Sequence, residues 1–241
     1  MSKKKDNVIS LPNLVGSVVL NNMAGEIDQL KKDKKVICEQ AARTILYALG
    51  CKDDYTYGHS MRVAHYSLCV GKEMGLNEEE LYDLELSALF HDIGKIGTPD
   101  KVLLKPSRLD ELEFAEMKKH PVISGEILSQ FDGFKNIAKY ARHHHERYDG
   151  RGYPDGLKGE EIPLFSRIIL IADTFDAMTS SRPYREGLTY NIAFEELEEF
   201  AGSQFDPNVV NLFIEAMKKE EAQKEDEFYI SIMQQKFKKA A

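Results

Sequence analysis

Apolar residues recur at helical spacing along most of the chain. In residues 34–50, Val36, Ala41, Ile45 and Leu49 repeat every four or five positions and predict one amphipathic helix that ends at a glycine. Together with capping residues and prolines, the same spacing predicts further helices over residues 57–74, 77–92, 110–117, 121–131, 134–145, 164–178, 192–200 and 207–217. The pattern therefore predicts an all-α fold.

The two ends of the chain depart from this pattern. Residues 1–33 carry no sustained apolar period, so we expect an N-terminal arm that is poorly ordered or partly helical. Residues 218–241 are charged with scattered apolar positions, which predicts a charged, helical C-terminal tail. Between the ends, residues 34–217 are expected to form one contiguous helical domain, braced by its first helix.

Two polar residues continue the apolar stripe of the helix predicted over residues 77–92. His91 and Asp92 follow Ala88 on the inward face, and Gly94 then suits the end of a helix. A buried carboxylate costs several kcal/mol unless it is paired or bound to a cation. On its own, the pair fits either a hydrogen bond within the core or part of a metal site.

Five more polar residues fall on inward positions of other helices. His59 shares a stripe with apolar residues, His120 lies at a helix junction, and Asp173 lies within an almost wholly apolar helix. His144 and His145 flank the inward direction of their helix. His59 alone fits a hydrogen-bonded core histidine, and Asp173 alone is either a member of an ion pair or a ligand. Adjacent inward histidines are poor core material, because each neutral ring needs a donor and an acceptor, so metal ligation explains the set better.

Composition and charge limit the classes of function. The chain has 241 residues, 42% of them hydrophobic, and a formal net charge of −8, which argues against a general nucleic-acid or anionic-membrane binder. No apolar run is long enough to span a bilayer, and we expect a cytoplasmic protein. Its 3 cysteines form no CxxC pattern, so neither a disulfide framework nor a zinc–thiolate site is indicated.

Two segments suggest a local site for a phosphorylated ligand. Residues 149–159 are rich in glycine and predict an ordered irregular loop. Arg182 and Arg185 follow the helix of Asp173, and guanidinium groups match phosphate oxygens bidentately. In a chain this acidic, both arginines also suit surface pairing with carboxylates.

With these residues assembled, the chain closely resembles the HD-GYP family, a subgroup of the HD phosphohydrolase superfamily. The resemblance covers roughly residues 51–217, and the motifs follow one another in order. They are His59-Ser60-Met61-Arg62-Val63-Ala64, His91-Asp92-Ile93-Gly94-Lys95-Ile96-Gly97, His120-Pro121, His144-His145-Glu146, Asp149-Gly150-Arg151-Gly152-Tyr153-Pro154, Asp173-Thr174-Phe175-Asp176-Ala177, Arg182-Pro183-Tyr184-Arg185 and Phe205-Asp206-Pro207. The His-Asp pair alone would be a weak signal, but the joint occurrence of the longer motifs is highly specific.

The resemblance implies an HD-type helical domain and a bacterial phosphodiesterase that opens cyclic di-GMP. It also implies two or three metal ions, usually iron or manganese. The implied ligands fall into two groups: His59, His91, Asp92 and Asp173 for one ion, and Asp92, as a bridge, with His120, His144 and His145 for the other. His65 and His143 are not on this list.

Five further residues receive roles from the resemblance. Lys95 would approach the scissile phosphate, the Gly152-Tyr153 loop would shape the nucleotide pocket, and Arg182 and Arg185 would grip phosphate or guanine. The alternative for Lys95 is a salt bridge to a buried carboxylate. In the implied mechanism, a hydroxide held between two cations about 3.5–4 Å apart attacks phosphorus in line.

One departure from the family bears on the number of metals. Members with a third metal have an acidic residue one helical turn before the position of His59, where this chain has Tyr55. We therefore expect two divalent metal ions, iron or manganese, and linear pGpG rather than GMP as the main product.

Three alternatives remain open at this point. The substrate can be another cyclic dinucleotide, such as cyclic GMP-AMP, because guanine contacts are not readable from the sequence. The chain can also be an adaptor that binds cyclic di-GMP, or a signalling partner such as a diguanylate cyclase, without turnover; a full ligand set argues against this. A nucleotidase acting on monomeric nucleotides is disfavoured by the Gly-Tyr-Pro loop. A homodimer is compatible with either function.

Overall fold

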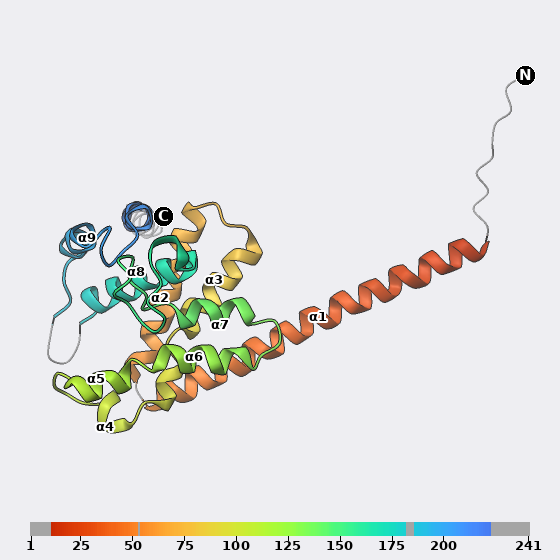
Figure 1. The fold of residues 1–241 in the computed structure, drawn as a ribbon. Coiled ribbons are helices and arrows are strands. Elements are labelled where there is room, and N and C mark those ends of the chain that lie inside the picture. The colour runs from red at the N-terminus through yellow and green to blue at the C-terminus, as the bar shows by residue number, and fades with distance from the viewer. Residues whose placement is uncertain (1–10, 53, 182–185, 223–241) are drawn as a thin grey trace, which may run out of the picture. The chain divides into compact units, whose positions relative to one another are not determined.

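The computed structural model describes residues 11–52, 54–181 and 186–222. The chain divides into two units, Met1–Ala41 and Ala42–Ala241. In the first unit, the described residues are the N-terminal part of one long helix, α1 (Leu11–Lys52), drawn in red to orange in Figure 1. No helix in the described part of the chain is both long and apolar enough to cross a membrane.

Helix α1 includes most of the segment that we expected to be an N-terminal arm. It begins at Leu11, within residues 1–33, for which we expected an arm that is poorly ordered or partly helical. Pro12 lies in the first helical turn, where its missing N–H group has no intrahelical partner to lose. Isolated glycines such as Gly16 weaken a helix by about 1 kcal/mol each but do not end it.

The second unit is an assembly of packed helices without β-strands among its described residues, as the sequence predicted (Figure 1). Its central pair is α2 and α8, with α3 packed beside both and α6 packed against α7. The aromatic ring of Phe175 in α8 contacts Tyr66 of α2 and Phe213 of the C-terminal helical run, with ring centroids 5.3 and 5.0 Å apart. The elements are α2 (Asp54–Glu73), α3 (Glu78–Phe90), η1 (Ile93–Gly97), α4 (Asp100–Leu103), α5 (Glu111–Met117), α6 (His120–Ser129), α7 (Lys135–Arg142), η2 (Gly159–Glu161), α8 (Leu164–Thr179), α9 (Tyr190–Glu199) and a helical run over residues 207–222.

Capping residues fix the start of two helices where the sequence predicted them. The Asn77 side chain accepts hydrogen bonds from the first turn of α3, and Glu80 bonds back to the Asn77 backbone. Asp110 and Glu113 make the same reciprocal pair at α5. Such pairs satisfy backbone donors that the helix itself leaves unpaired. The start of α3 in turn sets which of its residues reach the interior.

Gly94 has a different structural reason from the one expected. It lies within the 3₁₀ turn η1 rather than at a helix end. A Cβ atom at this position would lie 2.1 Å from the carbonyl oxygen of His120 and 2.5 Å from the backbone nitrogen of Ser124. The Gly94 N–H group donates to Ser124 Oγ, which donates to the carbonyl of His91. The missing side chain therefore lets η1 pack directly against the start of α6.

Replacing Gly94 by alanine tests this close approach. Because a Cβ atom would meet backbone atoms that cannot move aside, we expect Gly94→Ala to lower the free energy of unfolding by about 3 kcal/mol. Gly25→Ala is the matched control, since nothing lies within 4 Å of a Cβ there, and its effect should be at most about 1 kcal/mol. Urea unfolding followed by circular dichroism measures both; equal effects would contradict the packing argument.

Candidate metal centre

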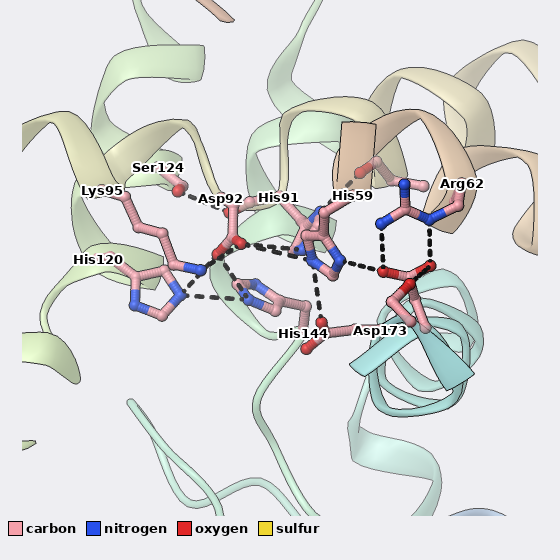
Figure 2. A network of polar contacts seen from close by, with 12 residues as sticks. His59, Arg62, His91, Asp92, Lys95, His120, Ser124, His144 and Asp173 are labelled. Carbon is pink, nitrogen blue, oxygen red and sulfur yellow. Dashed lines mark hydrogen bonds and ion pairs between the residues drawn. The ribbon is translucent and has the colours of Figure 1, made fainter. Parts of the chain in front are cut away.

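Seven histidine and aspartate side chains from five segments converge in the second unit, and Figure 2 labels all of them except His145. His59 comes from α2, His91 and Asp92 from the end of α3, and Asp173 from α8. His120 opens α6, and His144 and His145 lie in the turn that follows α7. The sequence predicted helix through residue 145, but α7 ends at Arg142. The predicted inward direction of the two histidines still agrees with the structure.

The seven residues form two groups in which ligand atoms lie within 4.8 Å of one another. One group is Asp92, His120, His144 and His145; the other is His59, His91 and Asp173. Nitrogen and oxygen donors without thiolate are the donor set of iron, manganese and zinc sites. The residues present therefore fit a metal centre. His65 and His143 belong to neither of these groups.

Asp92 lies between the two groups and faces both (Figure 2). Its Oδ1 atom is 3.1 Å from His120 Nε2, whereas its Oδ2 atom is 3.4 Å from His91 Nε2. Only 2% of its side chain is exposed, so this carboxylate is surrounded by nitrogen atoms rather than by water. A carboxylate with one oxygen toward each group can link two cations.

Backbone carbonyls orient three of the histidine rings. The Nδ1 atoms of His91, His120 and His144 are 2.6, 2.8 and 2.6 Å from the carbonyl oxygens of Ala88, Met117 and Ala141. If Nδ1 donates to a carbonyl, Nε2 has a free lone pair directed into the centre. Nε2 of His91 is fully buried and makes no hydrogen bond. A buried ring nitrogen of this kind is well explained by a cation ligand.

A second carboxylate holds the ring of His59. His59 Nδ1 lies 2.7 Å from Asp176 Oδ2, and His59 Nε2 lies 3.1 Å from Asp173 Oδ1. Arg62 donates to both oxygens of Asp176, at 2.6 and 3.1 Å, and Ser180 also donates to it. Asp176 thus fixes which nitrogen of His59 faces the centre.

The electrostatics separate the charged residues from the neutral ones. Burial acts to lower the pKa of His59, but the carboxylates of Asp173 and Asp176 outweigh it and raise this pKa to about 9. Burial also acts to raise the pKa of Asp173, yet His59 holds it well below its ordinary range. Burial and the neighbouring His120 lower the pKa of His145 to about 3. Before any metal binds, His59 is therefore protonated at neutral pH, and His145 is neutral.

The family of the chain follows from comparison with known proteins. A family model described as an HD domain matches residues 34–209. The chain belongs to the HD domain family. The sequence resemblance to HD-GYP proteins is confirmed by this match and by the relatives of the chain.

Two curated relatives and one solved structure illustrate the similarity. The response regulator RpfG of Xanthomonas campestris pv. campestris (strain 8004), named a cyclic di-GMP phosphodiesterase, is 41% identical over 194 residues, or 80% of this chain and 50% of that protein. The 3'3'-cGAMP-specific phosphodiesterase 3 of Vibrio cholerae is 40% identical over 156 residues, or 65% and 34%. The chain thus spans half or less of these relatives. An HDG"Y"P protein from Bdellovibrio bacteriovorus has the same fold, with a TM-score of 0.58 at 17% identity over 78% of this chain and 64% of that chain.

In this HD domain, the Gly-Tyr-Pro loop lies against His145. The Tyr153 ring is 4.9 Å from the His145 ring between centroids, and the Tyr153 N–H group donates to the His145 carbonyl. Burial, and then the carboxylates of Asp92 and Asp173, raise the pKa of Tyr153, so its hydroxyl stays protonated. A Cβ atom on Gly152 would lie 2.2 Å from the backbone nitrogen of Arg147. Gly152 therefore permits the loop to pass close to the centre.

Of the remaining predicted site residues, the structure describes Lys95 but not Arg182 or Arg185. Lys95 Nζ lies 2.6 Å from Asp92 Oδ2, which is the salt bridge that we considered as its alternative role. Arg182 and Arg185 lie outside the described residues, as does the side chain of Tyr55. Lys95 therefore lies at the site, where its ammonium group pairs with the buried carboxylate of Asp92.

Several residues that hold the predicted ligands or the Gly-Tyr-Pro loop in place were given no role from the sequence. Asp176 and Arg62 follow the predicted ligands Asp173 and His59 by three positions, so each lies one helical turn further along the same helix. A second carboxylate in the apolar helix α8 was a visible signal. Glu146 is buried and accepts hydrogen bonds from the backbone N–H groups of residues 155–157, which fixes the loop. That role depends on the folded loop and has no local sequence signal.

Metal affinity should increase with pH because His59 must lose its proton to coordinate a cation. With a pKa of about 9 in the metal-free protein, one proton is released on binding at neutral pH. The neighbouring carboxylates are already ionised and release none. We expect the affinity for Mn²⁺ to rise about tenfold per pH unit below pH 9 and to level off above it. Calorimetry in buffers of different ionisation enthalpy counts the protons; a pH-independent affinity would contradict the charge state of His59.

Asp176→Asn tests whether this carboxylate positions His59. We expect metal affinity to fall about 10- to 100-fold, as for other residues that orient ligands, while the folded helix content stays unchanged. The pH dependence of metal affinity should also become flatter in this variant, because His59 binds its proton less tightly without the Asp176 carboxylate. Asp155→Asn is the matched control, since Asp155 contacts His143, outside both groups, at 2.9 Å. Equal losses in both variants would contradict a positioning role.

Proposed function

We propose that this chain is a metal-dependent phosphodiesterase that hydrolyses cyclic di-GMP to linear pGpG. The observation that carries the proposal is the position of Asp92, whose two carboxylate oxygens face two different groups of histidines. A carboxylate so placed can bridge two cations, and paired cations are a recurrent device for in-line hydrolysis of phosphodiesters. The named activity of the relative RpfG supplies the substrate.

The proposed ligand sets follow the two groups. His59, His91, Asp92 and Asp173 would hold one divalent ion, and Asp92, His120, His144 and His145 would hold the other. When bound, the two ions supply Lewis acidity to the phosphodiester and lower the pKa of water from about 15.7 toward about 7. Iron or manganese suits a mixture of imidazole and carboxylate donors. Two ions rather than three are proposed because Tyr55 occupies the position of a third acidic ligand.

Other residues of the chain would bind and orient the substrate. Lys95 is within reach of the centre and partly exposed, so its ammonium group can exchange Asp92 for a non-bridging phosphate oxygen or protonate the leaving oxygen. Tyr153 presents a buried, protonated ring beside His145, and the loop of Gly152 and Tyr153 would form a wall of the nucleotide pocket. Arg182 and Arg185 are assigned to phosphate or guanine from the sequence alone.

The substrate 3'3'-cGAMP should be compared directly with cyclic di-GMP because of one relative. The Vibrio cholerae protein that is 40% identical to this chain is named as specific for 3'3'-cGAMP. Both cyclic dinucleotides have the same phosphodiester bonds and differ in one base. The metal centre would treat them alike, and discrimination would depend on contacts with the bases.

The activity is tested with anaerobically purified protein loaded with iron or manganese. Wild type should convert cyclic di-GMP to pGpG, and Asp92→Asn should lose at least about 10³-fold in rate, more than the 10- to 100-fold typical of residues outside the ligand shell. Asp33→Asn, at an exposed position of α1, is the matched control and should keep full activity. Chromatography resolves cyclic di-GMP, pGpG and GMP, with 3'3'-cGAMP assayed in parallel.

Each outcome of this assay bears on a separate part of the proposal. Nucleotide binding without turnover for either metal would contradict an enzymatic function. GMP as the main product would contradict the assignment of two metals and pGpG. Faster cleavage of 3'3'-cGAMP than of cyclic di-GMP would contradict the substrate while leaving the reaction intact.

A further inference from the structure

An exposed apolar stripe runs along helix α1. Met23, Ile27, Leu30 and Ile37 lie on it, with 52%, 49%, 67% and 65% of their surfaces exposed. Exposed large apolar residues are ordinary when they are scattered singly, but these four lie on one face of one helix. Such a stripe indicates a surface that packs against a partner.

The spacing along the stripe is that of a coiled coil. Met23, Ile27, Leu30, residue 34 and Ile37 follow one another at alternating steps of four and three, and Ala41, Thr44 and Ala48 continue the same register. This is a repeat of 3.5 rather than 3.6 residues, sustained over about 37 Å at a rise of about 1.5 Å per residue. A strict 3.5 repeat keeps one narrow seam facing a second helix along its whole length.

The packed face of the same helix lies elsewhere. Within the second unit, Leu46 of α1 is only 1% exposed, whereas Thr44 and Ala48 are exposed. Within this unit, the helix therefore packs through the face of Leu46 and leaves the seam positions Thr44 and Ala48 exposed. Most helical stability in proteins comes from packing of an amphipathic face. A long helix with an uncovered apolar seam thus implies a second helix on that seam.

We infer that α1 pairs with α1 of a second copy of this chain as a parallel, two-stranded coiled coil. The seam is self-complementary, because identical helices in register place each seam residue against its counterpart. The sequence places Lys34 at one core position of the heptad, and a lysine at a core position favours a defined register at some cost in stability.

Charge complementarity supports the parallel orientation. With Ile27 and Leu30 in the core, Glu26 and Lys31 occupy the two flanking heptad positions that face each other between parallel strands. They carry opposite charges, and such pairs select partner and orientation. The pairing involves only α1 and does not depend on the proposed reaction, so its failure and the failure of the phosphodiesterase activity are separate results.

The first test compares oligomeric mass. Light scattering after gel filtration should give wild type twice the 27.5 kDa mass of one chain. The double variant Leu30→Glu with Ile37→Glu should raise the dimer dissociation constant about 100-fold or more, because like charges would face each other across the seam. Lys32→Glu, on the outer face of α1, is the matched control and should stay dimeric. A monomeric wild type, or a dimer unaffected by the double variant, would overturn the proposal.

The second test reads register and orientation. In a variant whose native cysteines Cys38, Cys51 and Cys69 are replaced by serine, Ile27→Cys should form a disulfide with its own counterpart under mild oxidation. Lys32→Cys should not, because the outer faces of paired helices point apart. Rapid cross-linking of Lys32→Cys but not Ile27→Cys would overturn the seam. A dimer in which neither forms a disulfide would overturn the parallel register and leave an antiparallel or different contact.

Discussion

The buried carboxylate of Asp92 is the constraint on which the rest of the domain depends. It lies almost entirely out of water, so it needs positive charge or hydrogen-bond donors on every side. Lys95 and the histidines around it meet that requirement, and they come from segments far apart in the sequence. The packing of α3, α6, α7 and α8 thus brings together the groups that keep the Asp92 carboxylate ionised in the interior.

In the metal-free protein, the negative charge of the buried carboxylates is balanced by protonated side chains. The charge of a buried carboxylate pair must be balanced, and in the metal-free state His59 carries a proton beside Asp173 and Asp176. His144 and His145 cannot share that task, because burial and neighbouring rings lower the pKa of both. The protonated His59 and the ammonium group of Lys95 therefore supply part of the positive charge that bound divalent ions would provide.

Local patterns in the sequence were enough for the fold class and for the convergence of the seven predicted ligands. A polar residue on an apolar stripe reveals its direction even where the exact helix end is wrong, as for His144 and His145. The ligand role itself remains a prediction. Long-range contacts had no such signal: His59 and Asp176 are 117 positions apart, and their hydrogen bond depends on α2 packing against α8. The close approach at Gly94 likewise exists only once η1 meets α6.

The loop that carries Tyr153 is fastened to the turn of the histidines by its backbone. Gly152 fits against the main chain of residues 145–147, and Glu146 collects three amide groups from the far side of the loop. The path of the loop is therefore set by atoms that every amino acid shares, while side chains such as Arg151 project to the exterior. Exchanging such outward side chains would therefore leave the path of the loop, and with it the position of Tyr153 beside His145, unchanged.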